Sequence, residues 1–158
     1  MVVLAEPDRL SPVTQQQLRV YQRTSGRSGP SVPFRPGLIL DALIGYSLEG
    51  VPRGPVLDLI ESMREAHGPV ISLDVPSGLD STTGASPGES VEAAITVTLA
   101  LPKIGLVAPT AGELCLADLG IPKDVYARAG IHLPPIPLRR SLPHSPAQTN
   151  VVTTTEAR

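Results

Sequence analysis

The feature that most constrains the fold is a series of short apolar runs, one of which is followed by an amphipathic helical stripe. Each run reads as a strand buried on both faces, and the four clearest are residues 2–5, 38–40, 70–73 and 94–99. After the second run, Val56, Leu59, Ile60 and Met63 recur with the spacing of one helix face. The alternation predicts an α/β fold, Rossmann-like and three-layered (α/β/α), with a mostly parallel sheet.

Turn and capping residues place the remaining elements. Ser11 and Pro12 predict the start of a helix that continues through Arg23. We further expect a loop at 25–36, a short strand at 105–107, a turn at 110–112, a strand at 113–118 and helical turns at 123–129. These elements predict one domain over residues 1–138, followed by a disordered tail over 139–158.

Composition restricts the class of protein. The 158 residues carry a net charge of −2 and only four aromatic side chains, which argues against a nucleic-acid partner. The longest apolar stretch, 38–46, contains Asp41 and is too short to span a bilayer, so we expect no membrane partner. The single Cys115 cannot form an intramolecular disulfide, and it reads as a small core residue. A chain without an intramolecular disulfide is typical of the reducing cytoplasm, so we expect a cytoplasmic protein.

Two carboxylates stand where predicted strands end. Asp41 follows the run 38–40, Asp74 follows the run 70–73, and each precedes a glycine-bearing loop. Binding sites of parallel α/β sheets lie at this edge. Neighbouring carboxylates repel each other unless a cation or a shared proton intervenes, and oxygen ligands such as these and Ser77 suit a hard cation. The alternative, that both aspartates only cap the loops that follow, stays open at this point.

Two segments carry a specific resemblance. The runs Asp41–Ser47 and Leu73–Asp80, the second holding an Asp-x-Pro-Ser-Gly-x-Asp element, resemble the NAD(P)H-hydrate epimerase family, also called the YjeF N-terminal domain. The order continues through Pro102–Leu106 and Ala117–Pro122, and the similarity covers about residues 1–137.

The resemblance implies an activity and a set of site residues. Members interconvert the R and S forms of NADHX and NADPHX, so that a separate ADP- or ATP-dependent dehydratase can repair these hydrated cofactors. It implies a potassium ion bound by Asp41 and Ser77, and substrate contacts from Asp74. The loop expected to contact substrate comprises Gly45, Tyr46, Ser47, Leu48, Glu49, Gly50 and Val51. Members are commonly dimers, which makes a homodimer an expectation.

Two residue roles are hypotheses at this stage. Asp74 is the candidate acid/base near the reacting ring carbon, because a proton must move when the hydroxyl leaves and returns. Lys103 either lies near a phosphate or a carboxylate, or is an exposed loop lysine.

The resemblance also shows an omission. Family members normally begin with helices and a first strand that leads into a Gly-Asn-Asn-Gly-Gly-Asp-Gly loop, whose amides hold the nucleotide phosphates. One asparagine of that loop joins the potassium site, but this chain contains no Asn-Asn pair. We expect a gene start placed too far downstream to explain the omission. Without the loop, a non-catalytic Rossmann-like scaffold or partner-binding module, or a remnant without a ligand, is the alternative to an epimerase.

The omitted strand would lie centrally in a Rossmann-type sheet, between the strands at 2–5 and 38–40. The sheet is therefore expected to be incomplete at its N-terminal side, with a gap of about 10 Å. Three outcomes stay open: direct pairing of the flanking strands, a strand from another chain, or a fragment that is unstable alone.

Overall fold

The computed structural model describes residues 1–46, 48, 50–107 and 109–132. The chain divides into two compact units, Met1–Ile121 and Pro122–Arg158. The second unit contributes the helix α3 (Lys123–Arg128), at the position expected for helical turns. The predicted tail at 139–158 lies outside the described residues, so the domain boundary at residue 138 stays a prediction.

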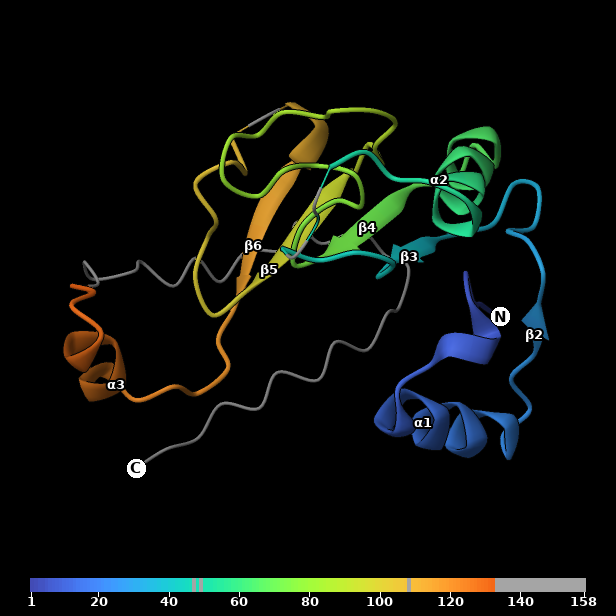
Figure 1. The fold of residues 1–158 in the computed structure, drawn as a ribbon, viewed down its shortest axis with the longest axis horizontal. Coiled ribbons are helices and arrows are strands. Elements are labelled where there is room, and N and C mark those ends of the chain that lie inside the picture. The colour runs from blue at the N-terminus through green and yellow to red at the C-terminus, as the bar shows by residue number, and fades with distance from the viewer. Residues whose placement is uncertain (47, 49, 108, 133–158) are drawn as a thin grey trace, which may run out of the picture. The chain divides into compact units, whose positions relative to one another are not determined.

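The main sheet of the first unit has four parallel strands (Figure 1). Its order is β3-β4-β5-β6, so each strand pairs with the next one along the chain. The strands are β3 (Ile39–Asp41), β4 (Val70–Leu73), β5 (Ile95–Leu99) and β6 (Glu113–Ala117). The predicted α/β class with a parallel sheet is confirmed, and the strands at 38–40, 70–73, 94–99 and 113–118 are confirmed to within a residue or two of their predicted bounds.

One face of this sheet is closely packed. Because successive side chains of a strand point to opposite faces, every second residue of each strand lies on that face. The register places Asp41 opposite Ser72, and Ser72 opposite Thr96. These three polar residues are at most 1% exposed, whereas Leu40, on the other face of β3, is 66% exposed. A buried carboxylate and buried hydroxyls therefore lie side by side on the packed face of the sheet, where each needs a hydrogen-bond partner.

The helix α2 (Pro55–Glu65) covers part of that face. It begins after Gly54 with a proline at its first position, where the missing N–H costs nothing. The predicted stripe is confirmed, because Leu59, Ile60 and Met63 are buried. Ile60 and Met63 share a core cluster with Ile39, Ala66, Val70 and Val91. At about 1.5–3 kcal/mol for each large apolar side chain, this cluster holds α2 against the start of β3 and β4.

A second apolar cluster anchors the loops at the carboxyl end of the sheet. It comprises Val75, Leu79, Leu106 and Ala111, each at most 2% exposed. Ala111 belongs to a short 3-10 helix, η2 (Pro109–Ala111), at the predicted turn. The cluster fixes the segment that follows β4, and this segment carries two of the predicted site residues, Asp74 and Ser77.

The N-terminal segment forms a separate pair of strands. β1 (Val2–Val3) pairs in parallel with β2 (Ser28–Gly29), within the stretch predicted to be only a loop. Between them lie a 3-10 helix, η1 (Pro7–Arg9), and the predicted helix α1 (Pro12–Gln22). The Ser11 hydroxyl accepts the Thr14 N–H at 3.2 Å, which confirms the predicted N-cap.

This pairing bears on the predicted gap. Among the described residues β1 pairs with β2 and not with β3, so the sheet does not close by direct pairing of the two strands that would flank the gap. β3 is consequently an edge strand of the four-stranded sheet. Of the three outcomes left open by the sequence, direct closure is therefore not found in this structure.

The predicted strand at 105–107 is wrong, because this segment is a turn. The Gly105 N–H donates to the Ser81 carbonyl at 2.9 Å, and the Leu106 N–H donates to the Lys103 carbonyl at 3.1 Å. A Cβ on Gly105 would lie 2.6 Å from the Asp80 carbonyl oxygen. The glycine is thus explained by close contact between two loops, a tertiary cause that a local apolar pattern does not reveal.

None of the helices in the described part of the chain has the length and apolar character needed to cross a membrane.

Candidate functional site

Asp41, the last residue of β3, lies at the centre of a buried hydrogen-bond cluster. Its Oδ1 accepts the Ser77 hydroxyl at 2.6 Å and the Leu43 N–H at 3.3 Å. Its Oδ2 accepts the Ser72 hydroxyl at 2.8 Å and the Ser77 N–H at 2.9 Å. Every oxygen of this 1% exposed carboxylate thus has two donors, which offsets the cost of its burial.

Ser77 links this cluster to the loop after β3. Its side chain is completely buried, and its Oγ also accepts the Ile44 N–H at 3.0 Å. The residue that follows, Gly78, has φ +94°, and a Cβ there would lie 2.3 Å from the Glu89 carbonyl oxygen. The Ser-Gly step of the Asp-x-Pro-Ser-Gly-x-Asp element therefore turns the chain tightly enough for Ser77 to offer both its N–H and its hydroxyl to Asp41.

The last aspartate of this element closes a separate turn. Asp80 accepts the N–H groups of Thr83 at 2.7 Å and Thr82 at 2.9 Å. These bonds, that of Thr83 first, lower the pKa of the Asp80 carboxyl from its ordinary value. Asp80 therefore orders the loop and is not directed at Asp41.

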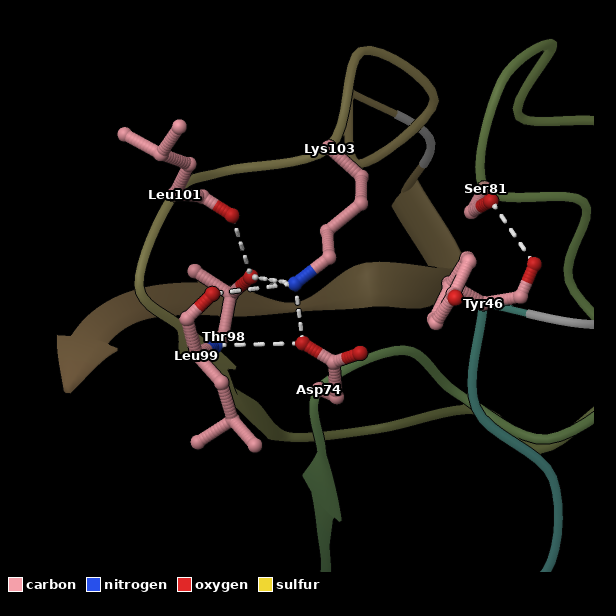
Figure 2. Close-up of polar contacts among 7 residues, drawn as sticks. All are labelled: Tyr46, Asp74, Ser81, Thr98, Leu99, Leu101 and Lys103. Carbon is pink, nitrogen blue, oxygen red and sulfur yellow. Dashed lines mark hydrogen bonds and ion pairs between the residues drawn. The ribbon is translucent and has the colours of Figure 1, made fainter. Parts of the chain in front are cut away.

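Asp74, the residue after β4, has a different environment. Its backbone has φ +70°, an uncommon conformation that aspartate tolerates better than most residues. Its Oδ1 accepts the Leu99 N–H at 3.1 Å and is paired with the Lys103 ammonium. Figure 2 shows the second oxygen directed away from Lys103, toward the side on which Tyr46 lies. The structure gives this oxygen, Oδ2, no hydrogen-bond donor among the described residues.

The sequence left open whether Lys103 lies near a phosphate or a carboxylate or is an exposed loop lysine. In the structure it lies against the Asp74 carboxylate. Besides Asp74, its ammonium donates to the Leu99 carbonyl at 3.1 Å and contacts Thr98 Oγ1 at 3.4 Å (Figure 2). The side chains of Lys103 and Asp74 are 22% and 15% exposed, so this ion pair is only partly in contact with water.

A pocket opens beside this ion pair. It has a volume of about 380 Å³ and is lined by Tyr46, Asp74, Leu99, Ala100, Leu101, Pro102 and Lys103. Gly45 borders the same region, because a Cβ on it would lie 3.8 Å from Asp74 Oδ2. The volume falls within the range of about 300–1,000 Å³ that is usual for small-molecule sites. Its lining is mostly apolar with a single charged pair, an arrangement that can orient a ring and exchange a proton.

The structure thus divides the predicted site into two adjacent parts. β3 and β4 are neighbours, as expected, but each aspartate has its own donors, and no hydrogen bond or ion pair joins them among the described residues. Asp41 and Ser77 come together in the buried part, while Gly45, Tyr46 and Asp74 border the open pocket.

Of the other loop residues that the structure describes, Leu48, Gly50 and Val51, none lines the pocket. Gly50 has φ +76°, and a Cβ on it would meet no other atom within 4 Å, while Val51 is 43% exposed. Leu48 is half-buried, and residues 47 and 49, the predicted Ser47 and Glu49 contacts, lie outside the described residues.

Ser72 is a site residue that sequence reasoning missed. It donates to Asp41 and is completely buried. The signal was present in Val70-Ile71-Ser72-Leu73, because strand alternation places this serine on the same face as Val70. A hydroxyl at an inward position needs a polar partner, and Asp41 on the neighbouring strand was the available one.

No group of three or more His, Cys, Asp or Glu side chains that could hold a metal ion occurs in the described ranges. Cys115, on β6, is half-buried, and burial first, then the charge of Glu113, raises the pKa of its thiol. A thiol of this kind is protonated near neutral pH and is a poor metal ligand.

Comparison with known proteins places these features in a family. Residues 1–105 match the family described as YjeF-related protein N-terminus. An NAD(P)H-hydrate epimerase of Dehalogenimonas lykanthroporepellens is 47% identical over 131 residues, which cover 81% of this chain and 54% of the relative. An NAD(P)H-hydrate epimerase of Truepera radiovictrix is 40% identical over 129 residues, covering 80% of this chain and 59% of the relative.

A longer relative shows the same domain in a larger protein. The bifunctional NAD(P)H-hydrate repair enzyme Nnr of Hyperthermus butylicus is 35% identical over 141 residues, covering 82% of this chain and 26% of the relative. The chain therefore spans between about a quarter and three fifths of the length of these relatives. With its parallel α/β sheet and its Asp-x-Pro-Ser-Gly-x-Asp turn, this chain belongs to the YjeF-related protein N-terminus family.

Proposed function

We propose that this chain is an NAD(P)H-hydrate epimerase that interconverts the R and S forms of NADHX and NADPHX. The observation that carries the proposal is the pocket at the carboxyl edge of the sheet, where Asp74 keeps one carboxylate oxygen free of protein donors among the described residues. Relatives named as NAD(P)H-hydrate epimerases, at 47% and 40% identity, support the same activity.

In this proposal Asp74 is the acid/base. Interconversion of the two forms requires the bond between the ring carbon and its hydroxyl to break and to form again on the opposite face. As the hydroxyl leaves as water it takes up a proton, and the water that adds returns one, so no net proton is consumed. A carboxyl group that borders the pocket can supply and recover that proton. Oδ2 of Asp74 is suited to this task because Oδ1 is already tied to Leu99 and Lys103.

The apolar lining would receive the hydrated ring. Tyr46 is 71% exposed at the pocket, and Leu99 and Leu101 line the same space. The substrate contacts that the resemblance implies for Gly45, Tyr46, Ser47, Leu48, Glu49, Gly50 and Val51 are part of this proposal. Of these, Gly45 and Tyr46 have support from their position beside Asp74.

The proposal includes a potassium ion held by Asp41 and Ser77. The donor set fits a hard cation, because it consists of oxygen atoms only: a carboxylate, buried hydroxyls, and the Ile44 carbonyl at 3.4 Å from Ser77 Oγ. In the described structure the buried Asp41 carboxylate is balanced by hydrogen bonds alone. A bound cation would take the place of some of these donors on Asp41 and hold the loop after β3 in place.

The potassium proposal has a test that does not depend on activity. A ligand that binds only the folded state raises stability by RT ln(1 + [L]/Kd). We therefore expect a higher thermal midpoint in KCl than in NaCl of equal ionic strength, and loss of this difference in Ser77→Ala. Equal midpoints in the two salts would argue against a potassium site.

The proposal extends to partners. An ADP- or ATP-dependent NAD(P)HX dehydratase is the functional partner, in line with relatives named as bifunctional repair enzymes. A homodimer and a cytoplasmic location complete the proposal. Size-exclusion chromatography with light scattering tests the homodimer, which a single monomeric mass would refute.

The proposed activity is tested by adding the chain to one purified NADHX epimer in potassium buffer. Appearance of the other epimer faster than in buffer alone is the expected result. A folded chain that leaves the epimer ratio unchanged would refute the proposal. Calorimetric titration with a nicotinamide nucleotide then separates the alternatives, because a chain without detectable binding heat would be a scaffold.

A further inference from the structure

Lys103 is one of the few lysines of this chain, and its side chain points into the protein and not into water. The sequence holds 13 lysines and arginines together, and only two of them, Lys103 and Lys123, are lysines. Lys103 follows Pro102 in the loop between β5 and η2, and its ammonium is directed into the protein (Figure 2). A lysine that had no structural partner would extend its ammonium into water.

All three hydrogens of the Lys103 ammonium have protein partners. They meet Asp74 Oδ1, the Leu99 carbonyl and Thr98 Oγ1. The Thr98 hydroxyl itself donates to the Leu101 carbonyl at 3.2 Å, so it is free to accept from Lys103. The charge of Lys103 is thus used within the protein and is not held ready for a phosphate.

These contacts of Lys103 fix the orientation of the Asp74 carboxylate. With the Leu99 N–H, Lys103 fixes Oδ1 from one side and leaves Oδ2 facing Gly45 and the pocket. Without the ammonium, the carboxylate would keep one backbone donor and could rotate about its side-chain bond. A rotated carboxylate would no longer present its free oxygen to a bound ring.

We propose that Lys103 is a positioning residue that orients Asp74 and balances its charge during proton transfer. This inference rests on the proposed function, since it assigns a role within the same reaction. The chemistry explains the choice of residue, because a compact ammonium can serve three acceptors in different directions. A planar guanidinium suits acceptors that lie in its own plane.

The test compares Lys103→Met with wild type and with Lys123→Met, which changes the other, exposed lysine. Misplacement of a reacting group by about 1 Å can cost about 100-fold in rate. We therefore expect kcat for epimerisation to fall about 100-fold in Lys103→Met, with KM within about threefold of wild type. Lys123→Met should match wild type in both constants.

Two further variants separate positioning from a general loss of structure. Lys103→Arg keeps the charge and should recover part of kcat. Lys103→Ala should respond to added methylammonium, which can occupy the vacated ammonium position, and a purely structural defect would not respond. Thermal midpoints near that of wild type would show that the variants fold, and the methylammonium response keeps the test informative if a midpoint falls.

The outcomes distinguish this inference from the proposed function. An active wild type together with an unchanged kcat in Lys103→Met would overturn the role of Lys103 alone. A raised KM with kcat unchanged would also overturn it and would make Lys103 a substrate contact. A folded wild-type chain that is inactive would overturn the proposed function and this role together.

Discussion

The buried carboxylate of Asp41 gives the sharpest prediction about stability. In Asp41→Asn, an amide nitrogen must replace one of two oxygens that each accept two hydrogen bonds. In place of Oδ2 the nitrogen would face the Ser77 N–H, a donor that cannot turn away. In place of Oδ1 it would face the Ser77 hydroxyl, which can rotate and accept, and the more distant Leu43 N–H at 3.3 Å. The second orientation is therefore preferred.

The magnitude follows from the bonds that are lost. The preferred orientation removes one long backbone bond and weakens the others, since the acceptor is no longer charged, so we expect a loss of about 2 kcal/mol. Asp41→Ala removes both oxygens and leaves the Ser77 N–H buried without an acceptor. Its expected cost is about 4 kcal/mol, within the range found when one partner of a buried charged network is removed.

Urea titration of both variants in sodium buffer, which avoids any contribution from potassium, measures these losses. The exposed Asp8→Asn is the matched control and should stay within about 0.5 kcal/mol of wild type. The slope of the titration should be unchanged. If Asp41→Asn and Asp41→Ala were both as stable as the control, the buried hydrogen-bond cluster would not contribute as we describe.

Three positions away from the aspartate pair carry further expectations. Gly78→Ala should cost at least about 2 kcal/mol in urea titration, because its Cβ would lie 2.3 Å from the Glu89 carbonyl oxygen at φ +94°, and a wild-type midpoint would refute this. The raised pKa of Cys115 leaves less thiolate, so its alkylation by iodoacetamide at pH 8 should be slower than that of a cysteine peptide, and an equal rate would contradict burial. Because the pKa of Asp80 is lowered on folding, its stabilisation is present at neutral pH and lost as the pH falls below about 4. Asp80→Ala should remove this part of the acid sensitivity, and identical acid-unfolding curves would exclude it.

Much of the fold could be predicted because local signals and tertiary structure agree. Val70–Leu73 is a strand over the predicted residues, and the helix with Leu59, Ile60 and Met63 buries that stripe. Ser11 caps its helix as its type suggests. In each case an apolar period or a capping residue specifies an element that packing then retains.

The errors occur where a local pattern is overruled by distant contacts. Gly105-Leu106-Val107 has the residues of a short strand, but Gly105 packs against the Asp80 loop and Leu106 against the second core cluster. Ser28–Gly29 has no strand propensity and becomes a strand only by pairing with Val2–Val3. A two-residue strand depends on its partner, which composition cannot reveal.

In the site, too, local signals predicted some features and distant contacts determined the others. Strand ends and the Ser-Gly turn located Asp41, Asp74 and Ser77, because parallel strands bring their carboxyl ends to one edge. The separate environments of the two aspartates could not be predicted. They depend on Ser72, which alternation turns inward, and on Lys103, which the chain brings back to Asp74 from 29 residues away.

The acid/base role of Asp74 is the centre of this account, and Asp74→Asn tests it most directly. Asparagine tolerates φ +70° and keeps an oxygen for Leu99 and Lys103, so the variant should fold, with a melting midpoint lowered only by the loss of the ion pair with Lys103. With one purified NADHX epimer in potassium buffer, we expect epimerisation to slow by about 100- to 10,000-fold relative to wild type and to Asp8→Asn. Epimerisation at the wild-type rate by folded Asp74→Asn would contradict the account.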